Sequence, residues 1–419
     1  MVFLETNIGR FLQARLNSLR RSMSVTKLIA ILVFQGFVTD LLAQESDAKN
    51  PADKIVLAHY MPWYEAKPFS KAWGWHWTMN RFDPEKRVND RPEIASHFMP
   101  LIGPYDSGDP HVLEYHLLLM KLAGIDGVVV DWYGLQKFRD YELLHRNTER
   151  LVEQAKRLGM KLVICYEDQT IPALVEAGRL NGENRVRHAM EELEWLKQNW
   201  FALESYVKLD GQPVLLSFGQ AGLTDAEWTQ CLTELKTPIA YFSLHHRRAA
   251  AVRAFDWPIP SQGTGAIKKF EERSRGWPIS MPVAFLRFKE VYAEARIHAS
   301  YGEIDDREGM TFEQTLEKAF NGNAPIIQIA TWNDWGEGTN IEPSQEFGYR
   351  DLSVILEWRK KLGQIKLATT ASTLRFPMKI LELRRAATNV AQQKRLDEIA
   401  EMLATGKLPL ATSELQKWK

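Results

Sequence analysis

Short apolar runs alternate with amphipathic segments along most of the chain, and this alternation limits the possible folds more than any other feature. The runs, which predict strands, cover residues 55–60, 127–132, 161–167, 213–218, 239–244, 279–285 and 326–332. The segments with helical periodicity cover residues 112–123, 141–158, 183–200, 225–235, 288–299 and 312–320. Strands that alternate with helices form right-handed βαβ units, so the sequence predicts a parallel sheet.

The number of strands favours a closed sheet over an open one. An eighth strand is expected within residues 261–266, which would complete a (β/α)8 barrel over residues 55–365. A doubly wound open sheet is the alternative. Its phosphate-binding fingerprint is missing, because Gly263-Thr264-Gly265 lacks the third glycine and lies late in the chain. We therefore predict an α/β protein of the (β/α)8 type without a nucleotide site.

The two ends of the chain differ from this middle part. Residues 366–419 are rich in Leu, Arg, Ala and Glu and predict helices over 379–387 and 389–405, which we interpret as a helical appendage. The apolar run at residues 28–38 has eleven residues, fewer than the roughly 20 that span a bilayer. Preceded by basic residues, it predicts a signal peptide over 1–43 and a polar leader over 44–54, with Met23 as an alternative start. We expect a secreted or periplasmic protein without a membrane span after cleavage; an uncleaved anchor is the alternative.

Composition excludes some classes of function. The 53 basic and 53 acidic residues cancel, which argues against nucleic acid as a partner. Fourteen Trp residues suit either a core or a surface that stacks on sugar rings. Cys165 and Cys231 are too few for a disulfide scaffold, and we expect two buried thiols. HExxH, CxxC pairs and GxSxG are absent, so we expect neither a metal ion nor an organic cofactor.

Polar and aromatic residues gather where the predicted strands end, which is where a barrel of this type has its active site. The earlier strand ends carry His59, Tyr60, Trp63, Tyr64, Asp131, Trp132, Tyr133, Glu167 and His245, next to His246. The last strand end carries Trp332, Asn333, Asp334, Trp335, Glu337 and Glu342. Two carboxylates three residues apart can share one reaction centre, where repulsion and burial raise one pKa and leave the other group ionised.

Structural explanations remain open for several of these residues. A carboxylate at a strand end often caps a helix or pairs with arginine, which applies to Asp131, Glu167 and Glu342. The histidines can be hydrogen-bonded structural residues. The aromatic stretch Trp73-Gly-Trp75-His-Trp77 is either a substrate-facing loop or a hydrophobic lid, and we include Trp75 among the binding candidates.

Three motifs together resemble the glycoside hydrolase family 71/99-like proteins, whose best-known members are endo-α-mannosidases of family 99. These motifs are HYMPWY at 59–64, GIDGVVVDWYG at 124–134 and IIQIATWNDWGEGTNIEPSQEFGY at 326–349. The resemblance implies a (β/α)8 barrel and cleavage of α-linked glycans with retention of configuration. The two catalytic glutamates of the family's Trp-Asn-Glu-Trp-His-Glu-Gly motif fall on Asp334 and Glu337, while Gly336 stands in place of the His.

The mechanism proposed for family 99 implies a role for each carboxylate. Asp334 would be the base at the sugar 2-hydroxyl, which attacks its own anomeric carbon to give a 1,2-anhydro sugar. Glu337 would protonate the leaving oxygen and later activate water. Conventional double displacement with Asp131 or Glu167 as partner of Glu337 is a variant of this hypothesis.

We therefore expect an exported glycoside hydrolase acting on a mannan-like or glucan-like glycan. A non-catalytic carbohydrate-binding protein on a degenerate barrel is the alternative. A glycosyltransferase-like relative is a third hypothesis, which the export signal disfavours. The sequence makes no prediction of oligomeric state.

Overall fold

The computed structural model describes residues 53–251, 253–365 and 367–418. The predicted signal peptide and nearly all of the predicted leader lie outside the described residues. Within them, no helix has the length and hydropathy needed to cross a membrane.

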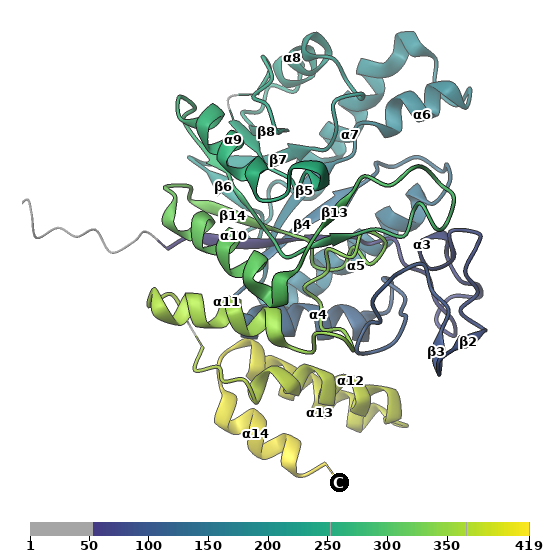
Figure 1. The fold of residues 1–419 in the computed structure, drawn as a ribbon, viewed down its shortest axis with the longest axis vertical. Coiled ribbons are helices and arrows are strands. Elements are labelled where there is room, and N and C mark those ends of the chain that lie inside the picture. The colour runs from purple at the N-terminus through teal and green to yellow at the C-terminus, as the bar shows by residue number, and fades with distance from the viewer. Residues whose placement is uncertain (1–52, 252, 366, 419) are drawn as a thin grey trace, which may run out of the picture. The chain divides into compact units, whose positions relative to one another are not determined.

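The centre of the fold is a barrel of parallel strands surrounded by helices (Figure 1). Its strands are β1 (Ile55–Tyr60), β4 (Gly127–Trp132), β5 (Lys161–Tyr166), β7 (Gln212–Ser217), β8 (Ala240–Leu244), β9 (Arg253–Phe255), β10 (Ser280–Met281), β11 (Val283–Phe285) and β14 (Ile326–Ala330). They are hydrogen-bonded in the order β10-β9-β8-β7-β5-β4-β1-β14-β11.

Pro282 marks the place where the barrel closes. β10 pairs with β9 on one side of this proline, and β11 pairs with β14 on the other. Proline has no N–H to continue a ladder, but its carbonyl accepts a hydrogen bond from the Gln328 N–H at 3.1 Å. β10 and β11 thus act as one interrupted strand, which brings the barrel to eight positions. The predicted (β/α)8 fold is confirmed and the doubly wound alternative is excluded.

Helices and short strands fill the connections. The helices are α3 (Trp75–Thr78), α4 (Pro110–Ala123), α5 (Tyr141–Leu158), α6 (Thr170–Glu176), α7 (Arg185–Asn199), α8 (Asp225–Glu234), α9 (Gly265–Ser274), α10 (Met310–Asn321), α11 (Arg350–Lys361), α12 (Phe376–Ala386), α13 (Val390–Ala404) and α14 (Leu408–Gln416). The short strands are β2 (Arg87–Val88), β3 (Arg91–Pro92), β6 (Lys208–Leu209), β12 (Phe288–Lys289) and β13 (Glu303–Ile304). Single 3₁₀ turns are η1 (Gly182–Asn184), η2 (Pro260–Gln262), η3 (Arg307–Gly309) and η4 (Thr373–Arg375).

Helix α4 is buried on nearly all sides, which explains its apolar sequence. Asp109 caps its first turn by accepting a hydrogen bond from the His111 N–H, Pro110 opens it, and Gly124 ends it in the left-handed conformation. The C-terminal helices α12 and α13 pack against it on the side away from the barrel (Figure 1). A buried ion pair at 2.8 Å between Arg384 and Glu114 joins α12 to α4.

Two sequence-based predictions of elements are wrong. Residues 261–266 form no strand: η2 and the start of α9 lie there, and the missing strand is β9. Residues 288–299 form no helix, because β12 pairs with β13 and the following backbone binds elsewhere. The Lys289 N–H donates to the Glu337 carbonyl at 2.8 Å, and the Val291 N–H donates to the Gly336 carbonyl at 2.9 Å. These tertiary bonds override the local helical pattern.

Candidate active site

A cavity of about 330 Å³ opens at the C-terminal ends of the barrel strands. Its polar lining includes His59, Asp131, Arg139, Glu167, Gln169, Thr170, Asp334 and Glu337. Its apolar and aromatic lining consists of Met61, Trp63, Tyr133, Tyr141, Ala173, Phe218, Trp257 and Tyr292. Four carboxyl groups from three different strand ends thus meet in one largely aromatic space.

The loop after β14 fixes the two carboxyl groups that the sequence places three residues apart. The Asp334 N–H donates to the Thr331 hydroxyl at 2.8 Å, and an Asp334 carboxylate oxygen accepts from the Glu337 N–H at 2.9 Å. Within the described residues, the Glu337 Oε2 atom is buried without a hydrogen-bond partner. Asp334 is therefore held in place, while Glu337 has one oxygen unused by the protein.

Burial raises the pKa of both Asp334 and Glu337, but not to the same extent. It raises the pKa of Asp334 to about 6, against the opposing hydrogen bonds from the backbone of Glu337 and Gly336. The pKa of Glu337 is raised well above its usual range by burial, and then by the charges of Asp334, Glu290 and Asp131. Asp334 is the member that ionises more readily, and Glu337 is the member that retains its proton.

The pKa values of the Asp131 and Glu167 carboxyl groups are also raised. Burial, followed by the charge of Asp334, raises the pKa of Asp131 to about 8. Burial and then the Asp131 charge raise the pKa of Glu167 well above its usual range, although Gln169 donates a hydrogen bond to it at 2.9 Å. Burial lowers the pKa of His59 to about 3, so this histidine is neutral at physiological pH.

Gly336, which stands where the resembling family has histidine, has little space for a side chain. A Cβ atom there would lie 3.0 Å from the Met79 Cε atom and 3.5 Å from the Tyr292 hydroxyl. Tyr292 belongs to the segment that was predicted as helix, and it lines the cavity. The end of the Met79 side chain would therefore have to shift to admit a side chain at this position.

Several predicted site residues lie behind the cavity rather than in its lining. Asn333 exchanges hydrogen bonds with the Met61 backbone at 2.8 and 2.9 Å. Glu342 accepts from the Tyr105 hydroxyl at 2.7 Å and contacts His116 at 3.0 Å. Tyr64 and Trp335 are joined by a bond from the Trp335 N–H to the Tyr64 hydroxyl at 3.0 Å. These side chains hold the loop after β14 in place.

Other predicted residues pack away from the cavity. The Tyr60 hydroxyl lies 3.0 Å from His116 Nδ1. Trp132 packs between helices against Trp195 and Trp200, and Trp332 is completely buried beside His116. His245 is 3.2 Å from Asp256 and is not part of the lining, and His246 is exposed.

A second cavity, of about 580 Å³, adjoins the first. Trp63, Tyr133, Arg139 and Tyr141 line both cavities, which are therefore contiguous. Trp75 lines the second cavity, together with His76, Glu65, Asp140 and Leu143. The rings of Trp63 and His76 stack at 4.3 Å, with Trp75 edge-on to His76 at 5.0 Å. Trp73 is partly buried, and Trp77 is fully buried.

Sequence reasoning missed several residues of the lining. Phe218 directly follows β7, and Trp257 lies two residues after the end of β9. The strand-end rule could therefore have identified Phe218, and also Trp257 if β9 had been located correctly. Arg139, Tyr141 and His76 lie on long connections and carry no such signal.

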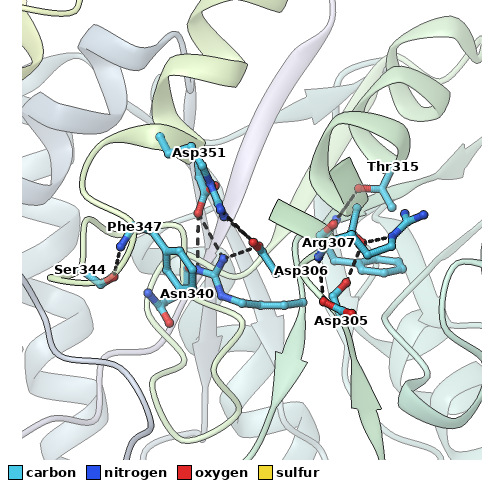
Figure 2. A network of polar contacts seen from close by, with 12 residues as sticks. Asp305, Asp306, Arg307, Thr315, Asn340, Ser344, Phe347 and Asp351 are labelled. Carbon is cyan, nitrogen blue, oxygen red and sulfur yellow. Dashed lines mark hydrogen bonds and ion pairs between the residues drawn. The ribbon is translucent and has the colours of Figure 1, made fainter. Parts of the chain in front are cut away.

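A separate polar network fixes the chain that follows the loop after β14 (Figure 2). Arg287, two residues after the end of β11, bonds to Asp306 at 2.9 Å, to Asp351 at 3.3 Å and to the Asn340 carbonyl at 2.7 Å. Its guanidinium carbon lies 3.8 Å from the centre of the Phe347 ring. The network thus ties the segment beyond Glu337 to the end of a neighbouring barrel strand.

Comparison with known proteins supports the resemblance drawn from the motifs. The model of glycosyl hydrolase family 99 matches residues 51–171. A glycoprotein endo-alpha-1,2-mannosidase-like protein of Danio rerio is 42% identical over 50 residues, which are 12% of this chain and 11% of that protein. The glycoprotein endo-alpha-1,2-mannosidase of Rattus norvegicus is 31% identical over 93 residues, 20% of each chain. The aligned parts thus span about a tenth to a fifth of these curated relatives.

Solved structures extend the likeness to the whole barrel. The GH99 endo-alpha-mannosidase from Bacteroides thetaiotaomicron superposes with a TM-score of 0.57 at 17% identity, covering 76% of this chain and 100% of that one. A glycoside hydrolase-like protein gives a TM-score of 0.53 at 14% identity, covering 76% and 96%. At these identities the likeness establishes the fold. The resemblance to glycosyl hydrolase family 99 is confirmed, in sequence over residues 51–171 and in fold over about three quarters of the chain.

Proposed function

We propose that this protein is a glycoside hydrolase that cleaves an α-linked glycan, mannan-like or glucan-like, with retention of configuration. One observation carries the proposal: Asp334 and Glu337 line one aromatic cavity and differ in how readily they ionise. Both the family resemblance and the position at the C-terminal face of the barrel agree with this assignment.

Each carboxyl group has a role that suits its environment. Asp334, as carboxylate, removes the proton of the sugar 2-hydroxyl, whose oxygen attacks the anomeric carbon while the glycosidic bond breaks. Glu337 gives its proton to the departing oxygen. Glu337 then takes a proton from water, which opens the 1,2-anhydro sugar, and Asp334 returns its proton to O2. Neither group has to lie beneath the anomeric carbon, as the nucleophile of a conventional retaining pair does.

The aromatic lining suits the apolar faces of sugar rings. Trp63, Tyr133 and Trp257 line the cavity beside polar groups that can bind hydroxyls. The contiguous second cavity gives room for further sugar units. The substrate is therefore proposed to be an oligomeric or polymeric carbohydrate. The apolar run at residues 28–38 supports export of the protein to the periplasm or the cell exterior.

The test is product release from α-mannans, α-glucans and host-type glycans by the purified protein. Glu337→Gln and Asp334→Asn are compared with wild type, and Glu153→Gln, an exposed glutamate of α5, is the matched control. We expect losses of about 10²-fold or more for the first two and none for the control. The first product, followed by NMR, should be the α-anomer.

Three results would contradict the proposal. A β-anomer as first product would exclude retention. Unchanged turnover in Asp334→Asn, with loss in Asp131→Asn or Glu167→Gln, would favour conventional double displacement. Glycan binding without cleavage, equal in wild type and both variants, would identify a carbohydrate-binding protein on a degenerate barrel.

A further inference from the structure

Three side chains with metal-binding atoms meet at the floor of the cavity. His59, Asp131 and Cys165 lie on the neighbouring strands β1, β4 and β5, and Asp131 pairs in register with Cys165. Paired residues of parallel strands face the same side of a sheet. One ligand atom from each of the three residues lies within 4.8 Å of the other two.

These three side chains are buried, and several of their polar atoms lack hydrogen bonds within the described residues. All three residues are buried, with exposures of 0% for His59, 6% for Asp131 and 0% for Cys165. Within the described residues, the Asp131 Oδ1 atom and both ring nitrogens of His59 have no hydrogen bond of good geometry, although the Gln328 side chain lies beside the histidine. Buried polar atoms without partners are uncommon and indicate a missing ligand or a functional role.

Charge and donor chemistry both favour a cation at this point. Among the described residues, four carboxyl groups and one arginine line the cavity, and that arginine is exposed. A neutral imidazole, a carboxylate and a thiolate form a mixed donor set that suits zinc and similar transition-metal ions. The Asp131 carboxyl group and the Cys165 thiol each release a proton to the solvent when the ion binds. A tetrahedral zinc ion holds its ligand atoms roughly 3.5 Å apart, so closure by little more than about 1 Å brings the three atoms into range.

We propose that His59, Asp131 and Cys165 bind a divalent transition-metal ion of the zinc class, with its open coordination position toward the cavity. An alternative role for His59 and Asp131, which line the cavity, is contact with sugar hydroxyls. That role would not involve the Cys165 thiol, which is not part of the lining. The ion and a glycan would compete for His59 and Asp131. This inference stands independently of the proposed hydrolase activity.

The experiment measures metal binding directly and needs no glycan. The full chain is freed of metal with a chelator and titrated with zinc chloride by calorimetry, and with cobalt(II) chloride by absorption spectroscopy. We expect one ion per chain and a near-ultraviolet thiolate-to-cobalt charge-transfer band. Cys165→Ser should abolish the band and weaken zinc binding by at least the about 10–100-fold seen for lost outer-shell partners.

The chain offers a matched control in its second cysteine. Cys231, on α8, is also buried, and its thiol donates a weak hydrogen bond at 4.0 Å to the Val186 carbonyl. Cys231→Ser should keep the band and the affinity, whereas Asp131→Asn and His59→Gln should weaken zinc binding. If Cys165→Ser fails to fold, the wild-type spectrum and Asp131→Asn still decide. Absence of stoichiometric binding to wild type, or equal binding in both cysteine variants, would overturn the proposal.

Discussion

At the scale of single residues, the different acidities of Asp334 and Glu337 predict a bell-shaped pH dependence. The base must be ionised, so kcat/KM should rise as pH increases through about 6, the pKa of Asp334. The acid must be protonated, so kcat/KM should fall at higher pH, where Glu337 loses its proton. The measurement is kcat/KM against pH on a cleaved glycan.

The residual activity of two variants provides the control for this profile. Glu337→Gln should lose the alkaline limb and keep the acid limb, and Asp334→Asn should do the reverse. An alkaline limb that persists in Glu337→Gln would assign the acid to another group, with Asp131 the first candidate because burial raises its pKa to about 8.

Residue-scale reasoning from the sequence finds strand ends but not which side chains face inward. His59 and Asp131 line the cavity, whereas their neighbours Tyr60 and Trp132 face the helices. Side chains alternate along a strand, so only one of each adjacent pair can reach the barrel interior. The sequence identifies two adjacent candidate residues at each strand end. Which of the two faces the barrel interior depends on how the strand packs.

At the scale of elements, Arg287 is expected to act as a positioning residue for the loop after β14. It is 2% exposed, and it joins Asp306 and Asp351 to the Asn340 carbonyl. Replacement by Met leaves two carboxylates with less compensation and should destabilise the protein by about 3–5 kcal/mol. The measurement is the free energy of unfolding in urea.

Arg307 is the comparison for this variant, because it lies in the same region but its guanidinium donates to neutral oxygens, at 2.9 Å to Thr311 and 2.6 Å to Gln314. Arg307→Gln should change the free energy of unfolding by about 1 kcal/mol or less.

Arg287→Lys should retain part of the stability and, if Arg287 positions the loop after β14, should lower kcat more than it raises KM. Equal stabilities of Arg287→Met and Arg307→Gln would refute this role.

Element prediction succeeded where local patterns and tertiary bonds agree. The seven predicted strands are present to within a few residues, because buried parallel strands have apolar, β-branched sequences. It failed over residues 288–299, where the backbone binds the loop that carries Glu337. It also misplaced the eighth strand: β9 has only three residues, too few to show a pattern.

At the scale of the whole molecule, the C-terminal helices are expected to stabilise the barrel without taking part in its chemistry. Their link to α4 includes the Arg384–Glu114 pair at 2.8 Å, with both side chains 4% exposed. Arg157 also reaches Glu114, with one nitrogen 2.5 Å from the Glu114 Oε2 atom. Because α4 follows β1 in the chain and packs against the barrel, loosening α12 should uncover apolar surface of the first βα unit.

Arg384→Met tests this view. Removing Arg384 leaves the buried Glu114 carboxylate with Arg157 as its remaining partner, so we expect a loss of about 3 kcal/mol or less in the free energy of unfolding. The neighbouring Arg385 is exposed, and Arg385→Met should cost about 0.5 kcal/mol or less. Below the melting transition, kcat/KM of Arg384→Met should equal that of wild type, because neither Arg384 nor Glu114 lines either cavity. A fall in kcat/KM with unchanged stability would show instead that the C-terminal helices act on the site.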